Sequence, residues 1–398
     1  MSSREREPGG RPPAGMVPLC VPEIRGREWA YVKECLDTGW VSSVGAFVTR
    51  FEHAMAEAVG VPYAVATTSG TAALHVSLQV AGVGTDDEVV VSGLTFVAPV
   101  NAIRYLGAWP VLTDADPVTW QMDVPQIVRF LEQGCDVVAG RVVNRATGRR
   151  VAAVVPVHIL GHPVDLDPLV AVCQRLGLPV IEDATESLGA WYRGRPVGSM
   201  GRASCLSFNG NKLLTTGGGG MVCSADAAFA DQVRYLTTQA KDDPIEYVHN
   251  TVGYNYRLTN VQAAIGVAQA EQLADFLATK RRIADRYREA LADVPWITLP
   301  VEAPWARSAW WLFTVLVGDG APGTSRDLMA WLNTQGVQSR PFWCPMHRLP
   351  PFAGVHVLGT EGVDRLYAQG LSLPCSVGLS EAEQTRVIDA IHGWQVTR

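Results

Sequence analysis

The sequence predicts an α/β protein: a mainly parallel central sheet sandwiched by helices, followed by a smaller C-terminal α/β domain. Two observations support this class. From about residue 51 onward, short apolar runs alternate with segments whose apolar residues recur every three or four positions. In addition, 47% of the 398 residues are apolar and only 18% are charged, so the chain can bury a large core. Such alternation is typical of a parallel sheet covered by helices.

The strands and helices of the larger domain follow from these runs. Seven apolar runs are short enough and well enough bounded to predict strands, and helical patterns fill many of the gaps between them. The predicted strands are residues 63–67, 88–91, 110–113, 152–157, 179–182, 203–208 and 220–223, and the predicted helices are 71–81, 97–106, 167–176 and 225–237.

A longer helical pattern at 260–291 suits a connection between domains. We expect an extension without fixed structure at residues 1–16, a large domain at 17–275 and a small domain at 276–398. Within the small domain, the sequence predicts an apolar run at 310–317, a helix at 325–335, a segment rich in Pro and Trp at 340–351, and a last helix from Ser380.

Charge and cysteine content exclude several classes of partner. A net charge of -6 gives no basic surface of the kind that neutralises nucleic-acid phosphates. No window approaches 18 uninterrupted apolar residues, so we expect no membrane span. The eight cysteines contain no C-x-x-C pair, and the N-terminus lacks the apolar stretch of a signal peptide. We therefore expect a cytoplasmic protein with reduced thiols.

Two segments place polar groups where a sheet of this type binds ligands. Ser69, Gly70, Thr71 and Ala72 follow a predicted strand and open a helix, whose N-terminal N–H groups attract anions. An ordinary helix cap is the alternative for this motif. The strand at 179–182 ends in Glu182 and runs on to Asp183, just past its carboxyl end, where open parallel sheets bind ligands.

The sharpest candidate is Lys212, which a polar turn delivers at the end of the run LSFNGNK. Four glycines at 217–220 follow and allow close approach of backbone to a ligand. A lysine in this position is ordinarily just solvated. When buried or coupled to charge, however, it becomes a nucleophile toward aldehydes. Together with Asp183, which can keep a pyridine nitrogen protonated, Lys212 predicts a site for pyridoxal phosphate (PLP).

Five motifs in order extend this prediction: SGTAAL, LTFVAPVNAI, VIEDATESLGA, SFNGNKLLTTGGGGM and GYNYRLTNVQAAIG. Their order from about Val21 to the C-terminus resembles the DegT/DnrJ/StrS family of PLP-dependent sugar aminotransferases, which have fold type I. The resemblance implies that Lys212 forms the Schiff base with PLP and that Asp183 pairs with the pyridine nitrogen.

The resemblance also implies the rest of the cofactor site. Phe96 would stack on the ring, and Thr71, Ala72 and Ser207, beside Gly70, would hold the phosphate. Asn255 of the partner subunit would complete the phosphate site, so the active unit would be a homodimer with shared active sites.

Other positions keep alternatives open. Glu186 stands where the family often has Gln or His, near the cofactor's phenolic oxygen. His158 and His162, with Asp165, suggest a metal site, but a fourth ligand is missing, and we expect packing or substrate contact and no metal. In the segment at 340–347, the resemblance places His347 and Arg340 near the nucleotide sugar.

The predicted reaction is a transamination in which an amino acid, expected to be glutamate, donates its amino group to a nucleotide-linked keto-sugar. The sequence around Lys212 is most similar to that of the subgroup that aminates C4 of UDP-2-acetamido-2,6-dideoxy-hexos-4-ulose. The alternatives are a dTDP-linked keto-sugar aminated at C3 or C4, another PLP reaction such as a lyase or dehydratase, and a non-catalytic sugar-nucleotide sensor. Lys212 argues against the dehydratases of the superfamily, which carry His there.

Overall fold

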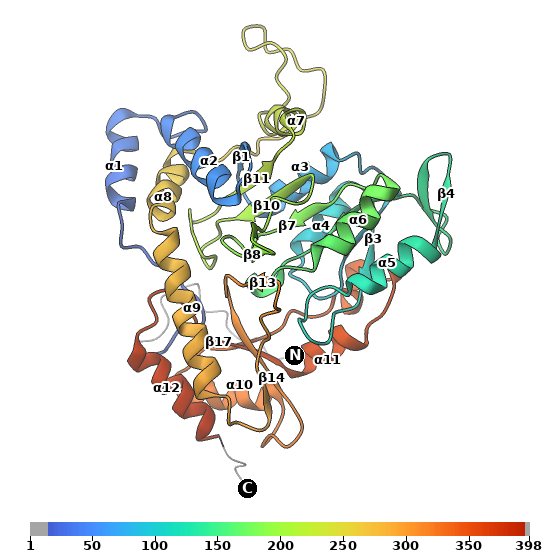
Figure 1. The fold of residues 1–398 in the computed structure, drawn as a ribbon. Helices are drawn as coiled ribbons and strands as arrows, with labels where there is room; N and C mark the ends of the chain where they lie inside the picture. The colour runs from blue at the N-terminus through green and yellow to red at the C-terminus, as the bar shows by residue number, and fades with distance from the viewer. Residues whose placement is uncertain (1–14, 395–398) are drawn as a thin grey trace.

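The computed structural model describes residues 15–394 (Figure 1). The predicted N-terminal extension, residues 1–16, lies outside these residues except for its last two. Between residues 15 and 394, no helix is both long and apolar enough to span a lipid bilayer.

Two four-stranded sheets form the centre of the larger part of the molecule. Parallel bridges from Val154 to Val180 and from Val157 to Asp183 join their edges, so the two sheets make one layer. Every pairing between neighbouring strands is parallel except the two made by β11. The order is β1 (Tyr63–Thr67), β11 (Gly220–Ser224), β10 (Ala203–Ser207) and β7 (Ile181–Asp183), then β6 (Val151–Val155), β2 (Glu88–Ser92), β3 (Trp109–Thr113) and β16 (His356–Val357).

This arrangement confirms the predicted fold class. Each of the seven predicted strands corresponds to a strand of this layer, and the bounds differ by at most two residues. The buried runs in β2 and β6 explain the agreement, because strands covered by helices on both faces are apolar throughout.

The helices that cover the layer were predicted only in part. The four helical patterns of the larger domain form α3 (Gly70–Val80), α4 (Ala98–Tyr105), α6 (Leu166–Leu176) and α7 (Ala227–Thr237). Side chains cap two of them, because Ser69 accepts from Ala72 N–H and Asp226 from Phe229 N–H. Three further helices were not predicted: α1 (Glu28–Thr38), α2 (Ala46–Val59) and α5 (Val124–Gln133).

The long helical pattern at 260–291 is two helices, α8 (Asn260–Ala270) and α9 (Leu273–Ala290), separated by Glu271 and Gln272. A capping box between Thr259 and Gln262 begins α8. In Figure 1, α9 runs from the part that holds the large sheet to the part that holds α10 and α12. The domain boundary near residue 275 falls inside α9 and stays a prediction.

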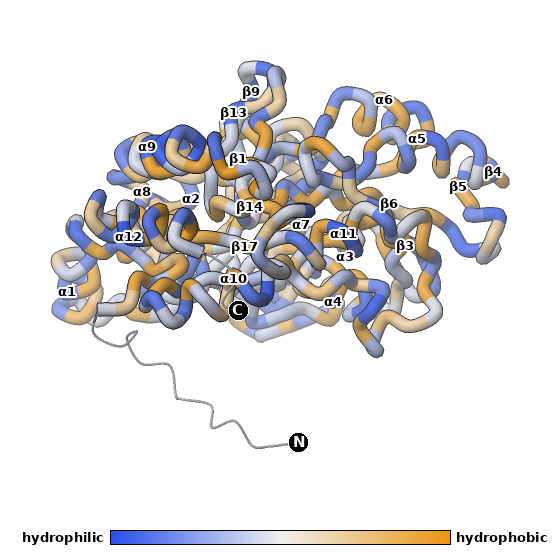
Figure 2. Tube along the Cα trace, turned by 90° about the horizontal axis from the view of Figure 1, so that it is seen from below, coloured by the Kyte–Doolittle hydropathy of each residue, from blue (hydrophilic) through white to orange (hydrophobic). Residues whose placement is uncertain are grey.

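The C-terminal part contains a second sheet with helices beside it. The apolar run predicted at 310–317 ends in a central strand of this sheet, and the helices predicted at 325–335 and from Ser380 are present. The sheet order is β12 (Ile297–Thr298), β14 (Phe313–Val317), β17 (Gly370–Leu373) and β15 (Arg340–Pro341), and the helices are α10 (Ser325–Thr334), α11 (Glu361–Gln369) and α12 (Glu381–His392). Figure 2 shows helices such as α12 and α9 alternating between hydrophilic and hydrophobic residues, as expected of helices that bury one face.

The remaining elements are short, and some of them lie at the surface. The hairpin of β4 and β5 leaves Val137 and Val138 exposed, and the loop after α7 projects at the top of Figure 1. The remaining strands are β4 (Cys135–Val138), β5 (Arg141–Asn144), β8 (Trp191–Tyr192), β9 (Arg195–Pro196) and β13 (Ala306–Arg307), and the 3-10 helices are Ile159–Gly161, Met346–Arg348 and Pro350–Phe352.

The first described residues pack against the C-terminal part. Val17 N–H donates to Gly336 O at 2.8 Å, and Gln338 N–H donates to Val17 O at 2.9 Å. Leu19 O accepts from Cys375 N–H at 2.9 Å. Residues 17–19 therefore join the smaller sheet region although they lie more than 250 residues before it in the sequence.

Candidate active site

A cavity of about 330 Å³ lies at the carboxyl ends of the parallel strands. Both parts of the molecule line it, since Trp311 and Trp343 come from the C-terminal part. Seven of the predicted site residues line it as well. They are Gly70, Thr71, Phe96, Asp183, Glu186, Ser207 and Lys212.

The start of α3 forms one wall with free N–H groups. Ser69 is extended, with φ of −166°, and its hydroxyl accepts from Ala72 N–H at 3.0 Å. The first-turn N–H groups of Gly70 and Thr71 have no partner within the helix, so they can receive an anion. Ala72 was predicted to contact the phosphate, but it is buried, and its N–H is already bonded to Ser69.

Two glycines allow the neighbouring strands to lie close to the start of α3. A Cβ on Gly220 would lie 2.3 Å from Ser69 O, and a Cβ on Gly70 would lie 2.9 Å from Ser207 Cβ. The start of β11 and the end of β10 can therefore lie this close to the start of α3 only because Gly220 and Gly70 lack a side chain.

Asp183 ends β7 and reaches the cavity while only 2% exposed. Burial raises its pKa, and the hydrogen bonds of Thr185 and the charge of Lys212 offset the rise only in part. Among the residues that the structure describes, no cationic side chain forms an ion pair with Asp183. A buried carboxylate without a cationic partner fits a protonated ring nitrogen in the cavity.

Glu182 points away from the cavity, as the alternation of a strand predicts. Its carboxylate accepts from the N–H groups of Gly198 and Gly201 at 2.9 and 2.6 Å and lies 3.2 Å from His158 Nε2. Burial alone would raise the pKa of Glu182, but these hydrogen bonds outweigh it and lower the pKa. Because Val164 N–H donates to His158 Nδ1, the imidazole proton lies on Nε2 and faces Glu182.

His162 is also a packing residue. Its Nε2 accepts from Ala303 N–H at 3.1 Å, and its ring packs edge-on against Trp305. Burial lowers its pKa to about 4. His162 Nδ1 lies 2.8 Å from Pro163 O, so protein groups contact both ring nitrogens of His158 and of His162. Asp165 accepts from the Tyr192 hydroxyl.

Lys212 lies between a carboxylate and an aromatic ring. Its Nζ is 3.4 Å from Glu186 Oε1 and 4.1 Å from the centroid of the Trp311 ring. Glu186 Oε2 accepts from Leu160 N–H at 2.9 Å, which fixes the carboxylate. Burial raises the pKa of Glu186 to about 6, although the charge of Lys212 opposes the rise.

The backbone around Trp311 is held from several sides. Its indole N–H donates to Asn211 O at 2.7 Å, and its carbonyl accepts from the buried Lys280 Nζ at 2.7 Å. The preceding residue, Trp310, has a φ of +52°, which is rare for a bulky side chain. A Cβ on Gly161 would lie 2.8 Å from Trp311 N. These constraints direct the Trp311 ring toward Lys212.

The predicted substrate contacts lie outside the cavity. His347 Nε2 is 3.2 Å from Asp364 Oδ1, and Arg340 is exposed on β15. Of the segment at 340–347, Trp343 lines the cavity instead. Trp311 was not predicted as a site residue either, because an aromatic residue in an apolar run ordinarily indicates core. Asn209 and Asn211 in the turn before Lys212 line the cavity as well.

Phe96 and Asn255 are both exposed. Phe96 lines the cavity with 54% of its surface accessible. Asn255 does not line the cavity of its own chain, and it lies in an extended segment next to β1, where Thr68 N–H donates to Tyr256 O at 2.8 Å. Contact of Asn255 with another subunit stays a prediction.

Known proteins resemble this chain over almost its whole length. A sequence model of the DegT/DnrJ/EryC1/StrS aminotransferase family matches residues 22–392. The chain is 39% identical over 376 residues to a GDP-perosamine synthase of Caulobacter vibrioides, covering 94% of this chain and 97% of that protein.

Two solved structures are similar along nearly their whole length. One is DesV of S. venezuelae in complex with a ketimine intermediate, with a TM-score of 0.83 and 30% identity, covering 96% of this chain and 99% of the other. The second is DesI in the presence of its TDP-sugar product, with the same TM-score and identity, covering 95% of this chain and 93% of the other.

Proposed function

Because the chain belongs to the DegT/DnrJ/EryC1/StrS aminotransferase family, we propose that the cavity around Lys212 is the active site of its amino-group transfer. The protein is a PLP-dependent sugar aminotransferase that acts on nucleotide sugars. One observation carries the assignment of the site: Lys212 Nζ and the unpaired carboxylate of Asp183 face the same cavity, beside the open N-terminus of α3.

The residues around the cavity fit the cofactor. Asp183 would pair with the ring nitrogen, Phe96 would cover the ring, and Gly70, Thr71 and Ser207 would hold the phosphate. When bound, PLP supplies an electron sink and carries the amino group between the two substrates. Glu186 would lie near the phenolic oxygen, since its carboxylate is adjacent to Lys212 Nζ.

Lys212 would bind the cofactor and then move protons. Its Nζ, once free, would move a proton from the carbon of the amino-acid donor to C4′ of the cofactor in the first half-reaction, and from C4′ to the sugar carbon in the second, the general acid–base step of each. Glu186 and the face of Trp311 limit where Nζ can lie. This would keep Nζ close to the carbon atoms between which it moves the proton. The charge on Asp183 would stabilise the protonated ring during the step.

For the substrate, we infer a keto-sugar aminated at C4, with an amino acid, glutamate in our proposal, as the donor. The motif around Lys212 supports UDP-2-acetamido-2,6-dideoxy-hexos-4-ulose. The likeness to a GDP-perosamine synthase supports a GDP-linked sugar as the second candidate. Trp311 and Trp343 would border the sugar from the C-terminal part in either case.

The proposed active unit is a homodimer with shared active sites. Asn255 of the partner subunit would reach the phosphate; in its own chain this residue is exposed and does not line the cavity. The loop after α7 leaves Ile245, Tyr247 and Val252 exposed, and Phe96 is exposed beside the cavity. A second subunit would cover such apolar surface.

Absorption spectra of the purified protein with PLP test this function. We expect a visible band that glutamate converts to a near-ultraviolet band, with release of 2-oxoglutarate. Lys212→Ala should show neither change, whereas Lys33→Ala, at an exposed lysine of α1, should behave as wild type. Absence of a Lys212-dependent band would refute the assignment of the site.

The keto-sugar is then identified with the glutamate-treated protein. UDP-, GDP- and dTDP-linked 4-keto-sugars are added separately, and the return of the visible band is followed. Return with one nucleotide identifies the substrate class. Binding of sugar nucleotides without return of the band would favour a non-catalytic sensor.

A further inference from the structure

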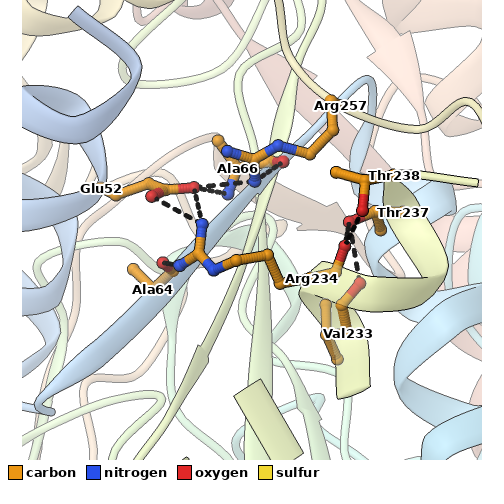
Figure 3. A network of polar contacts seen from close by, with 8 residues as sticks. All are labelled: Glu52, Ala64, Ala66, Val233, Arg234, Thr237, Thr238 and Arg257. Atoms are coloured by element: carbon orange, nitrogen blue, oxygen red, sulfur yellow. Dashed lines mark hydrogen bonds and ion pairs between the residues drawn. The ribbon is translucent and has the colours of Figure 1, made fainter. Parts of the chain in front are cut away.

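A nearly buried carboxylate, Glu52 on α2, joins three parts of the large domain (Figure 3). Its Oε1 accepts from Ala66 N–H on β1 at 2.8 Å and from Arg257 Nη1 at 2.8 Å. Its Oε2 accepts from Arg234 Nη1 of α7 at 3.2 Å. The Arg257 side chain is 10% exposed and that of Arg234 is 44% exposed, so the pair with Arg257 is the better shielded one.

Arg257 belongs to the short extended segment that carries Asn255. Backbone hydrogen bonds hold this segment between β1 and α7: Tyr256 O accepts from Thr68 N–H, and Tyr256 N–H donates to Thr237 O at 3.0 Å. Arg257 Nη1 also donates to Ala66 O at 3.0 Å. The guanidinium therefore fixes the end of the segment two residues beyond Asn255.

Strand β1 does not depend on this ion pair. Its five residues pair continuously with β11, which fixes its course up to Thr67. The segment of Asn255 forms only isolated bridges, at Thr67 with Arg257 and at Thr238 with Asn255. Within residues 15–394 the Asn255 side chain makes no hydrogen bond, so its position depends on its backbone. Backbone hydrogen bonds of Tyr254 and Tyr256 hold this backbone, and the guanidinium of Arg257 adds a side-chain anchor after them.

We propose that Glu52 and Arg257 are positioning residues for the neighbouring active site: their ion pair holds Asn255 where it contacts the cofactor phosphate bound by the partner subunit. This inference rests on the shared active sites of the proposed function. It requires that Glu52 acts across the subunit interface and leaves the residues that hold the phosphate in its own chain unchanged.

The effect is measured as the dissociation constant of PLP, from the visible band that depends on Lys212. Glu52→Gln removes the charge and keeps the size, and we expect weaker PLP binding by about tenfold, the effect of losing one charge-assisted hydrogen bond. Arg234→Gln is the matched control, because it removes the other guanidinium from the same carboxylate without touching the segment of Asn255. Arg234→Gln should change the dissociation constant of PLP less than twofold, because a half-exposed ion pair contributes little to stability.

Mixed dimers separate an effect across the interface from one within the chain. Two chains with different affinity tags are co-expressed, and the heterodimer is purified. In the first heterodimer, one chain carries Lys212→Ala and the other Asn255→Ala. Its only site with a lysine takes Asn255 from the Lys212→Ala chain, so native affinity is expected. Failure here would overturn the shared site itself.

Two further heterodimers test Glu52. When Lys212→Ala is in one chain and Glu52→Gln in the other, the site with a lysine takes Asn255 from a chain with native Glu52, and we expect native affinity. When both substitutions are in one chain and the other is native, that site takes Asn255 from the Glu52→Gln chain, and we expect the tenfold loss.

The reverse order, or equal losses in both heterodimers, would overturn the inference, because Glu52 would then act within its own chain or on general stability. Should Glu52→Gln not yield folded protein, Arg257→Lys is used in the same two heterodimers, with the same expected order.

Discussion

Glu186 Oε1 lies 3.4 Å from Lys212 Nζ, and both side chains face the cavity at the carboxyl ends of the strands. The carboxylate is almost fully buried, and burial raises its pKa from 4.5 to about 6. An acid of this kind holds its proton more tightly in the folded protein than in the unfolded chain. Its ionisation therefore opposes folding, and the position is electrostatically costly when the cofactor is absent.

The first prediction concerns the pH dependence of stability. Between pH 4.5 and 6 the folded state binds more protons at Glu186, so its contribution to stability falls as the pH rises through this window. Glu186→Gln lacks this loss. The free energy of unfolding of the variant, relative to that of wild type, should therefore rise by about 2 kcal/mol from pH 4.5 to pH 8.

Urea unfolding of cofactor-free protein at both pH values measures this gain. Glu57→Gln, at an exposed position of α2, serves as the control, and its difference from wild type should not depend on pH. A pH-independent difference for Glu186→Gln as well would show that burial does not shift this carboxyl group.

The second prediction concerns Trp311, whose ring centroid is 4.1 Å from Lys212 Nζ. Trp311→Leu removes the aromatic face against which Lys212 Nζ lies, so Nζ is less well positioned and its capture of PLP should slow about tenfold. Trp311→Phe keeps an aromatic face but loses the hydrogen bond to Asn211 O. It should stay within about threefold of wild type if the ring face matters.

Stopped-flow absorbance of the lysine-bound cofactor gives both rates. Equal slowing in Trp311→Leu and Trp311→Phe would assign the effect to the lost hydrogen bond and the turn that it holds, and would reject the aromatic contact.

The third prediction compares two glycines in the same run. A Cβ on Gly220 would lie 2.3 Å from Ser69 O, whereas a Cβ on Gly218 would meet nothing closer than 3.9 Å. Gly220→Ala should force the start of α3 away from β11 and lower stability by about 2 kcal/mol or more, together with PLP affinity. Gly218→Ala should change stability by about 0.5 kcal/mol or less.

Thermal unfolding and PLP titration of both variants check this contrast. If Gly220→Ala binds PLP as tightly as wild type, the close approach of β11 is not needed for the phosphate site.

The large sheet could be predicted because its strands are apolar throughout and end in recognisable turns. The run at Val89–Val91 is buried on both sides, and Asp183 and Lys212 follow such runs at the edge where parallel sheets bind ligands. Helix α1 could not be predicted in this way, because its inward side is partly polar. Glu28 accepts from Gln269, and Tyr31 donates to Glu271, so long-range hydrogen bonds replace an apolar stripe.

The aromatic walls of the site were missed for a different reason. Trp311 is about 100 residues from Lys212, and only the turn at Trp310 and the contact of Lys280 bring its ring into the cavity. No local pattern encodes such a contact. The same holds for Trp343, which the segment at 340–347 presents in place of the predicted His347 and Arg340.

The pairing of residues 17–19 with the C-terminal part bears on how the chain is made. Leu19 N–H donates to Gln338 Oε1, 319 residues away. At the ribosome this stretch takes roughly 15 to 60 s to translate. Until then the partners of Val17 and Leu19 in the C-terminal part do not exist, so these apolar side chains stay unpaired or are bound by a chaperone. Cys20, which donates to Asn211 O beside Lys212, is carried by the same segment. Residues 17–20 are thus translated early but are among the last to reach their place.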